Sequence, residues 1–400
     1  MRHPHRRDFL HQSTAAGLAL SAAGGFAVPA EPDRLRVVVL EGTAHERGLT
    51  HGKTLKEPIH ALVKLWKADL AERYKMEADA FIPKFLRYTD YLPAIRQWTP
   101  DLLEEIRGIA QGAAIDFDTM LVFQLIDEYW VNGPGAAGEH CSALGISRQG
   151  DRPAYVAQNM DLEGFRDGFQ TVLHIKHADA KRETLVLTHA GLIGLNGVNN
   201  RSIGICCNTL TQLANGKDGL PVACVVRGAL EQPSDEAAIG FLRKVKHASG
   251  QNYILGGPSK VYSFECSAGK VAPFTPATGA DMLWHTNHPL ANDDYTAKYR
   301  EELEKKKGAA GQPGNSEVRL QSVEKRLRAA GKAGGLDLIR TILTAKDSAE
   351  HPVCRAFKNK KDSFTFASTI MVLAEKPEMH ITPGPPDGQR YQTLAFDGGR

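Results

Sequence analysis

Val131-Asn-Gly-Pro-Gly-Ala-Ala-Gly-Glu-His140 is followed directly by Cys141-Ser-Ala-Leu-Gly-Ile-Ser-Arg148. Helical patterns precede this junction, and alternating strand patterns follow it. If the chain is cut before Cys141, the thiol and a new α-amine lie on one residue, which is then a nucleophile with its own base. The junction therefore predicts helices on one side, strands on the other, and Cys141 as a candidate nucleophile.

The region before the junction is expected to be mostly helical after a first strand over 35–42. A helix over 54–75 has four apolar residues on one face, among them Trp66. Thr99-Pro100-Asp101 marks another helix start, with a capping hydroxyl and proline at the first position. A further helix is expected over 117–130.

The region after the junction carries eight candidate strands, at 141–148, 154–160, 170–177, 184–190, 202–208, 251–256, 260–266 and 365–374. Gly150-Asp151 makes the first two a hairpin. Helices are expected at 221–231, 234–247 and 293–307, followed by a linker, Gly308–Asn315. Strands clustered together, with helices in separate blocks, predict an α+β fold built in layers.

Composition and charge exclude several classes of protein. The chain has 400 residues, 42% apolar and 24% charged, which is typical of a globular protein. The net charge is +3, and residues 1–30 supply +2 of it, so the remainder is about neutral. No basic surface for nucleic acid is indicated. Six cysteines in this length do not indicate a disulfide scaffold.

The first 30 residues are predicted to be a targeting segment. Arg6-Arg7-Asp8-Phe9-Leu10 is a twin-arginine pattern, a weakly apolar stretch follows, and Val28-Pro29-Ala30 fits a cleavage site. Export to the periplasm or the extracellular space is therefore expected, with no stable membrane span after signal removal. An ordinary secretory signal or a retained anchor is the alternative.

Five further segments carry polar residues at the ends of these elements. They are Gln158-Asn159-Met160-Asp161, the glycine-rich stretch from Gly191 to Asn208, His285-Thr-Asn287-His288, Pro352-Val-Cys-Arg355, and Thr382-Pro-Gly-Pro-Pro386. With Cys141, this ordered set resembles the isopenicillin-N acyltransferase-like family of N-terminal-nucleophile (Ntn) hydrolases. These are cysteine relatives of choloylglycine hydrolase and penicillin V acylase. The resemblance covers most of residues 35–396.

The resemblance implies a four-layer αββα sandwich and self-cleavage of the His140–Cys141 bond. Residues 31–140 then form a helical segment and residues 141–400 a catalytic one, which stay together as a heterodimer. Cys141 matches the nucleophile and Asp161 the acidic residue of an Asn-x-Asp motif. Two asparagines of the site match Asn208 and Asn287, and Asn287 is the better candidate for the oxyanion hole. Arg355 matches an arginine at the substrate or cleavage site.

Two positions depart from the family pattern. His140 stands where the family often has glycine. Gln158 stands where the choloylglycine branch has arginine, three residues before the aspartate, so the bile-salt branch is disfavoured.

The expected reaction passes through an acyl-thioester on Cys141, formed from a linear acyl amide or an acyl thioester. No cofactor is expected. His285 and His288 lack a third ligand, so no metal is expected either. Two alternatives stay open. One is an uncut hydrolase with a Cys–His–Asp triad, in which His174, His189 or His285 is the base. The other is a non-catalytic periplasmic binding protein on the same scaffold.

Overall fold

A computed structural model describes residues 35–132, 141–178, 181–277, 279, 281–306, 312–331 and 333–396. The predicted signal segment, residues 1–30, lies outside these ranges. The glycine-rich junction from 133 to His140 lies outside them as well. Cys141 is described, so the structure places the candidate nucleophile but not the bond before it.

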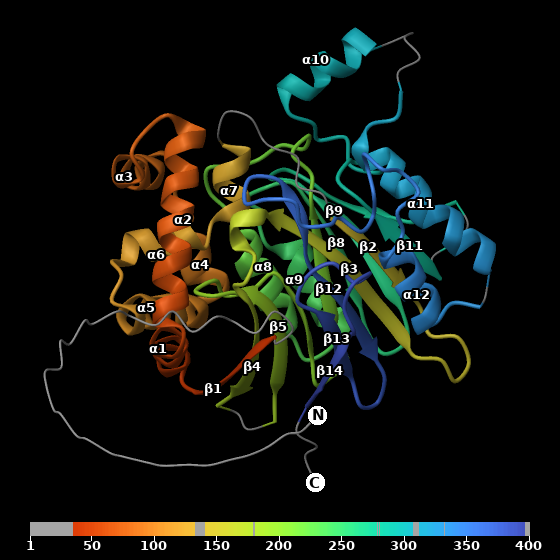
Figure 1. Ribbon diagram of the computed structural model, residues 1–400, viewed down its shortest axis with the longest axis horizontal. Coiled ribbons are helices and arrows are strands. Elements are labelled where there is room, and N and C mark those ends of the chain that lie inside the picture. The colour runs from red at the N-terminus through yellow and green to blue at the C-terminus, as the bar shows by residue number, and fades with distance from the viewer. Residues whose placement is uncertain are drawn as a thin grey trace, which may run out of the picture. The chain divides into compact units, whose positions relative to one another are not determined.

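Two stacked β-sheets form the centre of the fold (Figure 1). The first has eight strands in the order β1-β4-β5-β6-β7-β8-β9-β10, which comprise Arg36–Gly42, Gln170–His177, Glu183–His189, Asn196–Asn199, Gly204–Thr209, Gln251–Gly256, Val261–Cys266 and Val271–Phe274. The second has six strands in the order β11-β2-β3-β12-β13-β14, which comprise Met282–His285, Ser142–Ile146, Ala154–Glu163, Ser363–Leu373, Glu378–Thr382 and Gln392–Ala395. β1 pairs with β4 in parallel, whereas the other described strand pairs are antiparallel.

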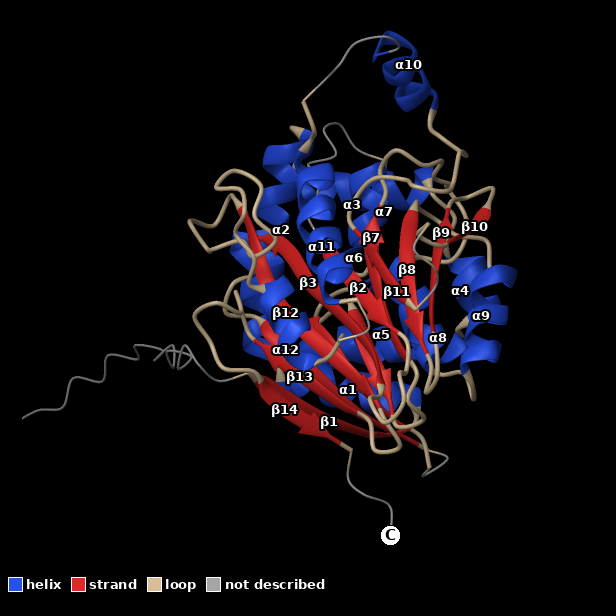
Figure 2. Ribbon diagram, turned by 90° about the vertical axis from the view of Figure 1, so that its right-hand side faces the viewer, coloured by secondary structure: helices blue, strands red, loops and turns tan. Residues whose placement is uncertain are grey.

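Helices cover the outer face of each sheet (Figure 2). The helices before the junction are α1 to α7, at Ala44–Thr54, Lys56–Tyr74, Ala78–Tyr88, Leu92–Trp98, Pro100–Ala113, Phe117–Phe123 and Ile126–Val131. α8 (Val222–Leu230) and α9 (Asp235–Lys244) pack on the eight-stranded sheet. α11 (Asn315–Ala330) and α12 (Leu336–Leu343) pack on the six-stranded sheet. α10 (Ala297–Lys306) stands apart from the layers in both views.

The order of layers is therefore helix, sheet, sheet, helix. β2 and β3 face β7 and β8 across the interior, and the largest apolar cluster lies there and beneath the N-terminal helices. A second cluster fills the space between the six-stranded sheet and α11 and α12. The predicted α+β class and the four-layer αββα sandwich are confirmed.

Several elements differ from their predicted bounds. The helix expected at 54–75 is α2, and α1 precedes it as a separate helix begun by the capping box of Thr43 and Glu46. The helix expected at 117–130 is broken into α6 and α7. α10 starts at Ala297, four residues later than predicted. α11, α12 and the short strands β10, β11, β13 and β14 were not predicted.

The predicted cap at Thr99 is wrong. α5 does start at Pro100, but the Thr99 hydroxyl makes no capping bond. It donates instead to the Ile95 carbonyl at 3.4 Å, which also accepts the Thr99 backbone N–H at 2.9 Å, because α4 ends at this turn directly before α5 begins. Within the described part of the chain, no helix is long and apolar enough to cross a membrane.

Candidate active site

Cys141 directly precedes β2 and is 2% exposed. β2 pairs with β3 so that Ser142 lies opposite Asn159, which brings Cys141 beside Met160. Their sulfur atoms are 3.5 Å apart. Side chains alternate between the faces of a strand, and the Cys141 side chain belongs to the face that looks toward the eight-stranded sheet. The candidate nucleophile therefore lies between the two sheets.

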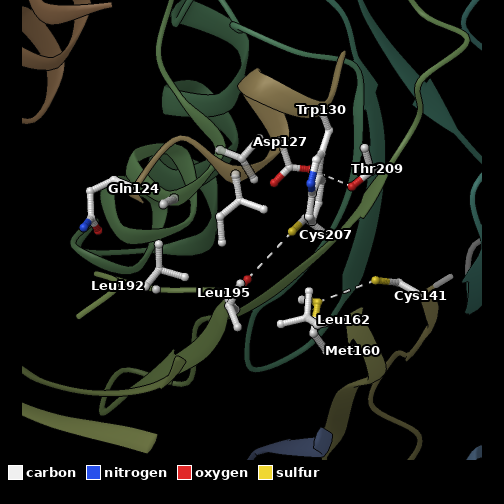
Figure 3. Close-up of a pocket in the computed structure, with 14 residues that line it drawn as sticks. Gln124, Asp127, Trp130, Cys141, Met160, Leu162, Leu192, Leu195, Cys207 and Thr209 are labelled. Atoms are coloured by element: carbon white, nitrogen blue, oxygen red, sulfur yellow. Dashed lines mark hydrogen bonds between the residues drawn. The ribbon is translucent and has the colours of Figure 1, made fainter. Parts of the chain in front are cut away.

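A small cavity of about 20 Å³ adjoins the Cys141 thiol (Figure 3). That volume holds about one water molecule. Its walls are mostly apolar and come from α6, α7, β3, the 192–195 turn, β7 and α8. The lining residues are Gln124, Ile126, Asp127, Trp130, Cys141, Met160, Leu162, Leu192, Gly194, Leu195, Cys207, Thr209, Val222 and Ala223. Both sides of the junction thus contribute to one pocket.

Arg319 connects two of the predicted site residues. Its Nη1 donates to the Cys141 carbonyl at 2.6 Å and to the Ser142 hydroxyl at 2.9 Å. Its Nη2 donates to the Asn287 side-chain oxygen at 2.9 Å. The guanidinium is fully buried, and burial lowers its pKa to about 10 despite the opposing charges of Asp161 and Cys141.

Sequence reasoning missed Arg319. It lies in α11, whose sequence Asn315-Ser-Glu-Val-Arg-Leu-Gln-Ser is mostly polar and charged. An arginine in such a helix ordinarily belongs to a solvated face. Only the packing of α11 on β2 and β11 shows that this one is inside.

Asp161, which is fully buried, pairs with the part-buried Arg355 on the other face of β3. The Arg355 Nε lies 3.4 Å from the Asp161 Oδ2. The Thr365 hydroxyl donates to the Asp161 Oδ1 at 2.8 Å and accepts the Arg355 backbone N–H at 2.9 Å. A β-bulge in β12 falls between Thr365 and Ala367, opposite Asp161. Such bulges commonly re-aim a side chain beside an active site.

Burial raises the pKa of Asp161 to about 7, while the charges of Arg355 and Arg319 and the Thr365 bond act in the opposite direction. An acid with this pKa is balanced between its charged and neutral forms near neutrality. A cation brought close to Asp161 would therefore shift it to its charged form.

Asn287 is held at both ends of its amide. Its oxygen accepts from Arg319, and its Nδ2 donates to the Thr209 carbonyl at 3.1 Å. A primary amide has two N–H donors, so one remains for a substrate oxygen. The Asn287 backbone N–H donates to the Ser316 hydroxyl at 2.7 Å. The side chain is thus fixed in orientation, as an oxyanion donor must be.

Asn208 is also buried. Its oxygen accepts from the Asn252 amide at 3.3 Å. Its Nδ2 has no acceptor among the described residues. An unsatisfied buried donor costs about 1–3 kcal/mol, so Asn208 has a hydrogen bond available to a bound group. The neighbouring Thr209 lines the cavity.

The three histidines of the triad alternative have other partners. His174 contacts Glu183 at 2.5 Å, and His189 contacts Arg166 at 2.8 Å. His285 contacts Glu265 at 2.8 Å, both side chains being fully buried. No histidine is among the described residues that line the cavity. Nor do three or more His, Cys, Asp or Glu side chains of the described ranges gather as a metal site.

The chain also matches the sequence model of a known protein family. The model for the family described as acyl-coenzyme A:6-aminopenicillanic acid acyl-transferase matches residues 147–386, more than half of the chain. The chain belongs to this family. The resemblance drawn from the motifs is therefore confirmed, and the protein is an enzyme of the acyltransferase and amide-hydrolase class. The matched region contains Asp161, Asn208, Asn287 and Arg355, and it begins six residues after Cys141.

A relative in the same family supports this membership. The 40 kDa form of the acyl-coenzyme A:6-aminopenicillanic-acid-acyltransferase of Emericella nidulans is 24% identical over 326 residues. This alignment spans 81% of the present chain and 85% of the relative.

Solved structures of more distant proteins are also similar. A mutant conjugated bile acid hydrolase from Clostridium perfringens aligns with a TM-score of 0.38 at 13% identity, over 64% of this chain and 97% of its own. A penicillin V acylase from Agrobacterium tumefaciens aligns with a TM-score of 0.36 at 13% identity, over 64% of this chain and 86% of its own. The fold assignment rests on the layers described above.

Proposed function

We propose that the protein is an exported, self-processing Ntn enzyme that hydrolyses or transfers the acyl group of a non-peptide amide or thioester. Cys141 becomes the N-terminal residue of the catalytic segment when the His140–Cys141 bond is cut. The observation that carries the proposal is the position of Cys141. It directly precedes β2 and lines a cavity, and its carbonyl is connected through Arg319 to Asn287.

The chemistry follows from the groups around Cys141. The new α-amine titrates near pH 8, so it can accept the thiol proton. The thiolate attacks the acyl carbonyl, and the negative charge goes to the carbonyl oxygen. The amides of Asn287 and Asn208 can donate to that oxygen, a contribution of about 3 kcal/mol for one good donor.

Collapse of this intermediate expels the amine or thiol of the substrate with a proton from the ammonium group. An acyl-thioester on Cys141 remains. Water then releases the carboxylic acid, or an amine takes the acyl group to form a new amide. Asp161 lies on the outer face of β3, where it pairs with Arg355 and can balance the charge of the α-ammonium.

The test is to trap the acyl-thioester. Purified protein is mixed with acyl p-nitroanilides and acyl thioesters of several chain lengths, and the reaction is quenched in acid. The intact mass of the protein is then measured by mass spectrometry. The fragment that begins at Cys141 is expected to gain the mass of the acyl group. Cys141→Ala is expected to gain nothing, whereas Cys207→Ala, which removes the other thiol of the cavity, keeps the adduct.

Other outcomes identify the alternatives. An uncut, full-length chain that turns over substrate would favour the Cys–His–Asp hydrolase. An uncut chain with no adduct and tight ligand binding would favour a binding protein.

Export is a separate part of the proposal. Replacing both Arg6 and Arg7 with Lys is expected to retain the protein in the cytoplasm, because the twin-arginine pair is the recognised signal. Fractionation followed by immunoblotting measures this. Undiminished recovery outside the cytoplasm would contradict twin-arginine export.

A further inference from the structure

A single carboxylate lies in the mostly apolar wall of the cavity beside Cys141. Asp127 belongs to α7 and is one of the lining residues, together with Ile126, Leu162 and Val222 (Figure 3). No sequence motif includes Asp127, and the mechanism proposed above does not use it.

The hydrogen bonds of Asp127 are one-sided. The Thr209 hydroxyl donates to Oδ1 at 2.6 Å, and the Gln251 amide donates to the same oxygen at 2.8 Å. Among the described residues, no donor bonds to Oδ2, and no Lys, Arg or His forms an ion pair with Asp127. One carboxylate oxygen is thus left for a ligand.

The neighbouring Glu128 faces a different environment. Its Oε1 accepts from the Val222 backbone N–H at 3.0 Å and from the Ser249 hydroxyl at 3.2 Å. Burial and the nearby charge of Asp127 raise the pKa of Glu128 to about 8. Burial also raises the pKa of Asp127, while the Thr209 and Gln251 hydrogen bonds lower it. A cation beside the second oxygen of Asp127 would favour its charged form.

Asp127 is part-buried, and a carboxylate in such a position without a cationic partner is unfavourable, because its partial desolvation is not offset by an opposite charge. A ligand that brings a cation into the cavity removes this cost. A neutral ligand of the same shape leaves it in place or increases it by expelling water. The site is therefore built to discriminate between the two.

We infer that Asp127 is a specificity-determining residue, and that it selects substrates carrying a primary ammonium group a few bonds from the reacting carbonyl. This inference rests on the proposed function at Cys141 and deepens it. The ammonium can belong to the acyl part or to the amine part of the substrate, and both place the same chemistry in the cavity.

The experiment compares matched substrates that differ only in charge. The acyl arm uses the p-nitroanilides of 4-aminobutanoic and pentanoic acids. The amine arm uses the pentanoyl amides of 1,2-diaminoethane and propylamine. The wild-type enzyme is expected to favour the ammonium member of one arm by at least tenfold in kcat/KM, and that arm identifies the part of the substrate that carries the charge.

Asp127→Asn is expected to abolish this preference, which is a fall of at least about tenfold in kcat/KM for the ammonium substrate, because it removes the charge and keeps the shape. It is expected to leave the neutral substrate within a few-fold of wild type. Glu128→Gln is the matched control on the same helix, and it should keep the preference.

Three results would overturn the inference. One is equal kcat/KM for both members of both arms in the wild-type enzyme. Another is an unchanged preference in Asp127→Asn. The third is an equal fall of kcat for charged and neutral substrates, which would show that Asp127 only positions Thr209.

A second measurement needs no variant. Butylammonium is expected to inhibit the wild-type enzyme competitively at a concentration at least tenfold lower than butanol, and equal inhibition would count against the inference. Failure of the proposed function gives a different signature, since no substrate of either arm would then form an adduct on Cys141.

Discussion

Arg319 makes more contacts to predicted site residues than any residue that the motifs singled out. It holds the Cys141 carbonyl and the Asn287 oxygen with two nitrogens of one rigid guanidinium. Because the Asn287 oxygen is engaged, the amide nitrogen of Asn287 must point toward the Thr209 carbonyl. We therefore expect Arg319 to position the oxyanion donor without touching the substrate.

Arg319→Lys tests this positioning role. Lysine keeps the charge but cannot span both acceptors, so kcat should fall by on the order of tenfold to a hundredfold for one or two lost charge-assisted bonds, with KM nearly unchanged. Steady-state kinetics measures the split. Arg326→Lys is the control on the same helix, since Arg326 pairs with Asp347 near the surface. A raised KM with unchanged kcat would instead indicate a role in substrate binding.

Asp161 gives a prediction for the dependence of stability on pH. Burial raises its pKa from 3.8 to about 7 in the folded chain, so between these values the folded state binds more protons than the unfolded state. The free energy of unfolding must then fall as pH rises through this window, by up to about 1.4 kcal/mol per pH unit. Well below pH 3.8 the carboxyl is protonated in both states and the effect vanishes.

The measurement uses the uncut chain. Urea unfolding of Cys141→Ala and of Cys141→Ala/Asp161→Asn is compared between pH 4.5 and 7.5. The aspartate-containing protein should lose stability relative to the asparagine variant as pH rises. Parallel curves would show that Arg355 and Arg319 keep Asp161 ionised throughout.

At the residue scale, candidate site residues could be named where they lie in motifs that follow one another in a characteristic order along the chain. Cys141, Asp161, Asn208, Asn287 and Arg355 were named from motifs, and the structure pairs Asp161 with Arg355 and brings Asn287 to Cys141 through one residue. Arg319 and Asp127 could not be named, because each depends on packing between elements distant in sequence. A single sequence does not specify which charged side chain of a polar helix is buried.

At the scale of elements, the break between α6 and α7 places Gln124 where it can bind the turn beside the cavity. The apolar pattern over 117–130 predicted one helix, but Gln124 ends α6. Its amide donates to the Gly191 carbonyl at 2.9 Å and accepts the Ile193 N–H at 2.9 Å. Gly191 has a φ of 88°, a conformation that favours glycine. Gln124, at the end of α6, thus holds in place the turn whose residues Leu192, Gly194 and Leu195 line the cavity.

Gln124→Leu tests this fastening. Leucine is close in size but leaves two buried backbone groups unpaired, which should lower the free energy of unfolding by about 2 kcal/mol or more. KM should rise with kcat largely retained, because the wall of the cavity moves and the nucleophile does not. Denaturant unfolding and steady-state kinetics measure the two effects. Gln111→Leu, on the exposed face of α5, should change stability by no more than about 0.5 kcal/mol.

The predicted elements show where sequence patterns suffice. β4 runs over 170–177 as predicted, and the β2–β3 hairpin forms as expected. α11 was missed because its apolar stripe is narrow: among its buried residues only Val323 and Leu327 are apolar. β11 and β13 are too short to show the alternation of apolar and polar residues that predicts a strand. The layer formed by α11 and α12 therefore followed only from the family resemblance.

At the scale of the whole molecule, the two segments on either side of the junction share one core. β1 belongs to the N-terminal segment, yet it pairs along seven residues with β4 of the catalytic segment. A buried ion pair joins Glu105 to Arg227 at 2.8 Å. The His51 ring accepts the Gly191 N–H at 3.0 Å. Neither segment can leave without exposing a sheet edge and unpaired buried charge.

Self-cleavage is therefore expected to divide the chain without separating it. The Cys141 thiol attacks the His140 carbonyl, the peptide nitrogen becomes the α-amine, and water releases the His140 carboxylate from the resulting ester. Removal of residues 1–30 leaves fragments of 110 (140 − 30) and 260 (400 − 140) residues. They should elute together in native size exclusion and separate in denaturant, where intact mass identifies each.

Cys141→Ala should give one uncut, inactive chain, and Cys141→Ser should cut slowly, since a hydroxyl is the weaker nucleophile. Cys354→Ala, which alters a thiol beside Asp387, should be cut like the wild type. A fully active wild-type protein whose mass spectrum shows only the uncut chain would overturn self-processing and leave the cavity to an internal thiol.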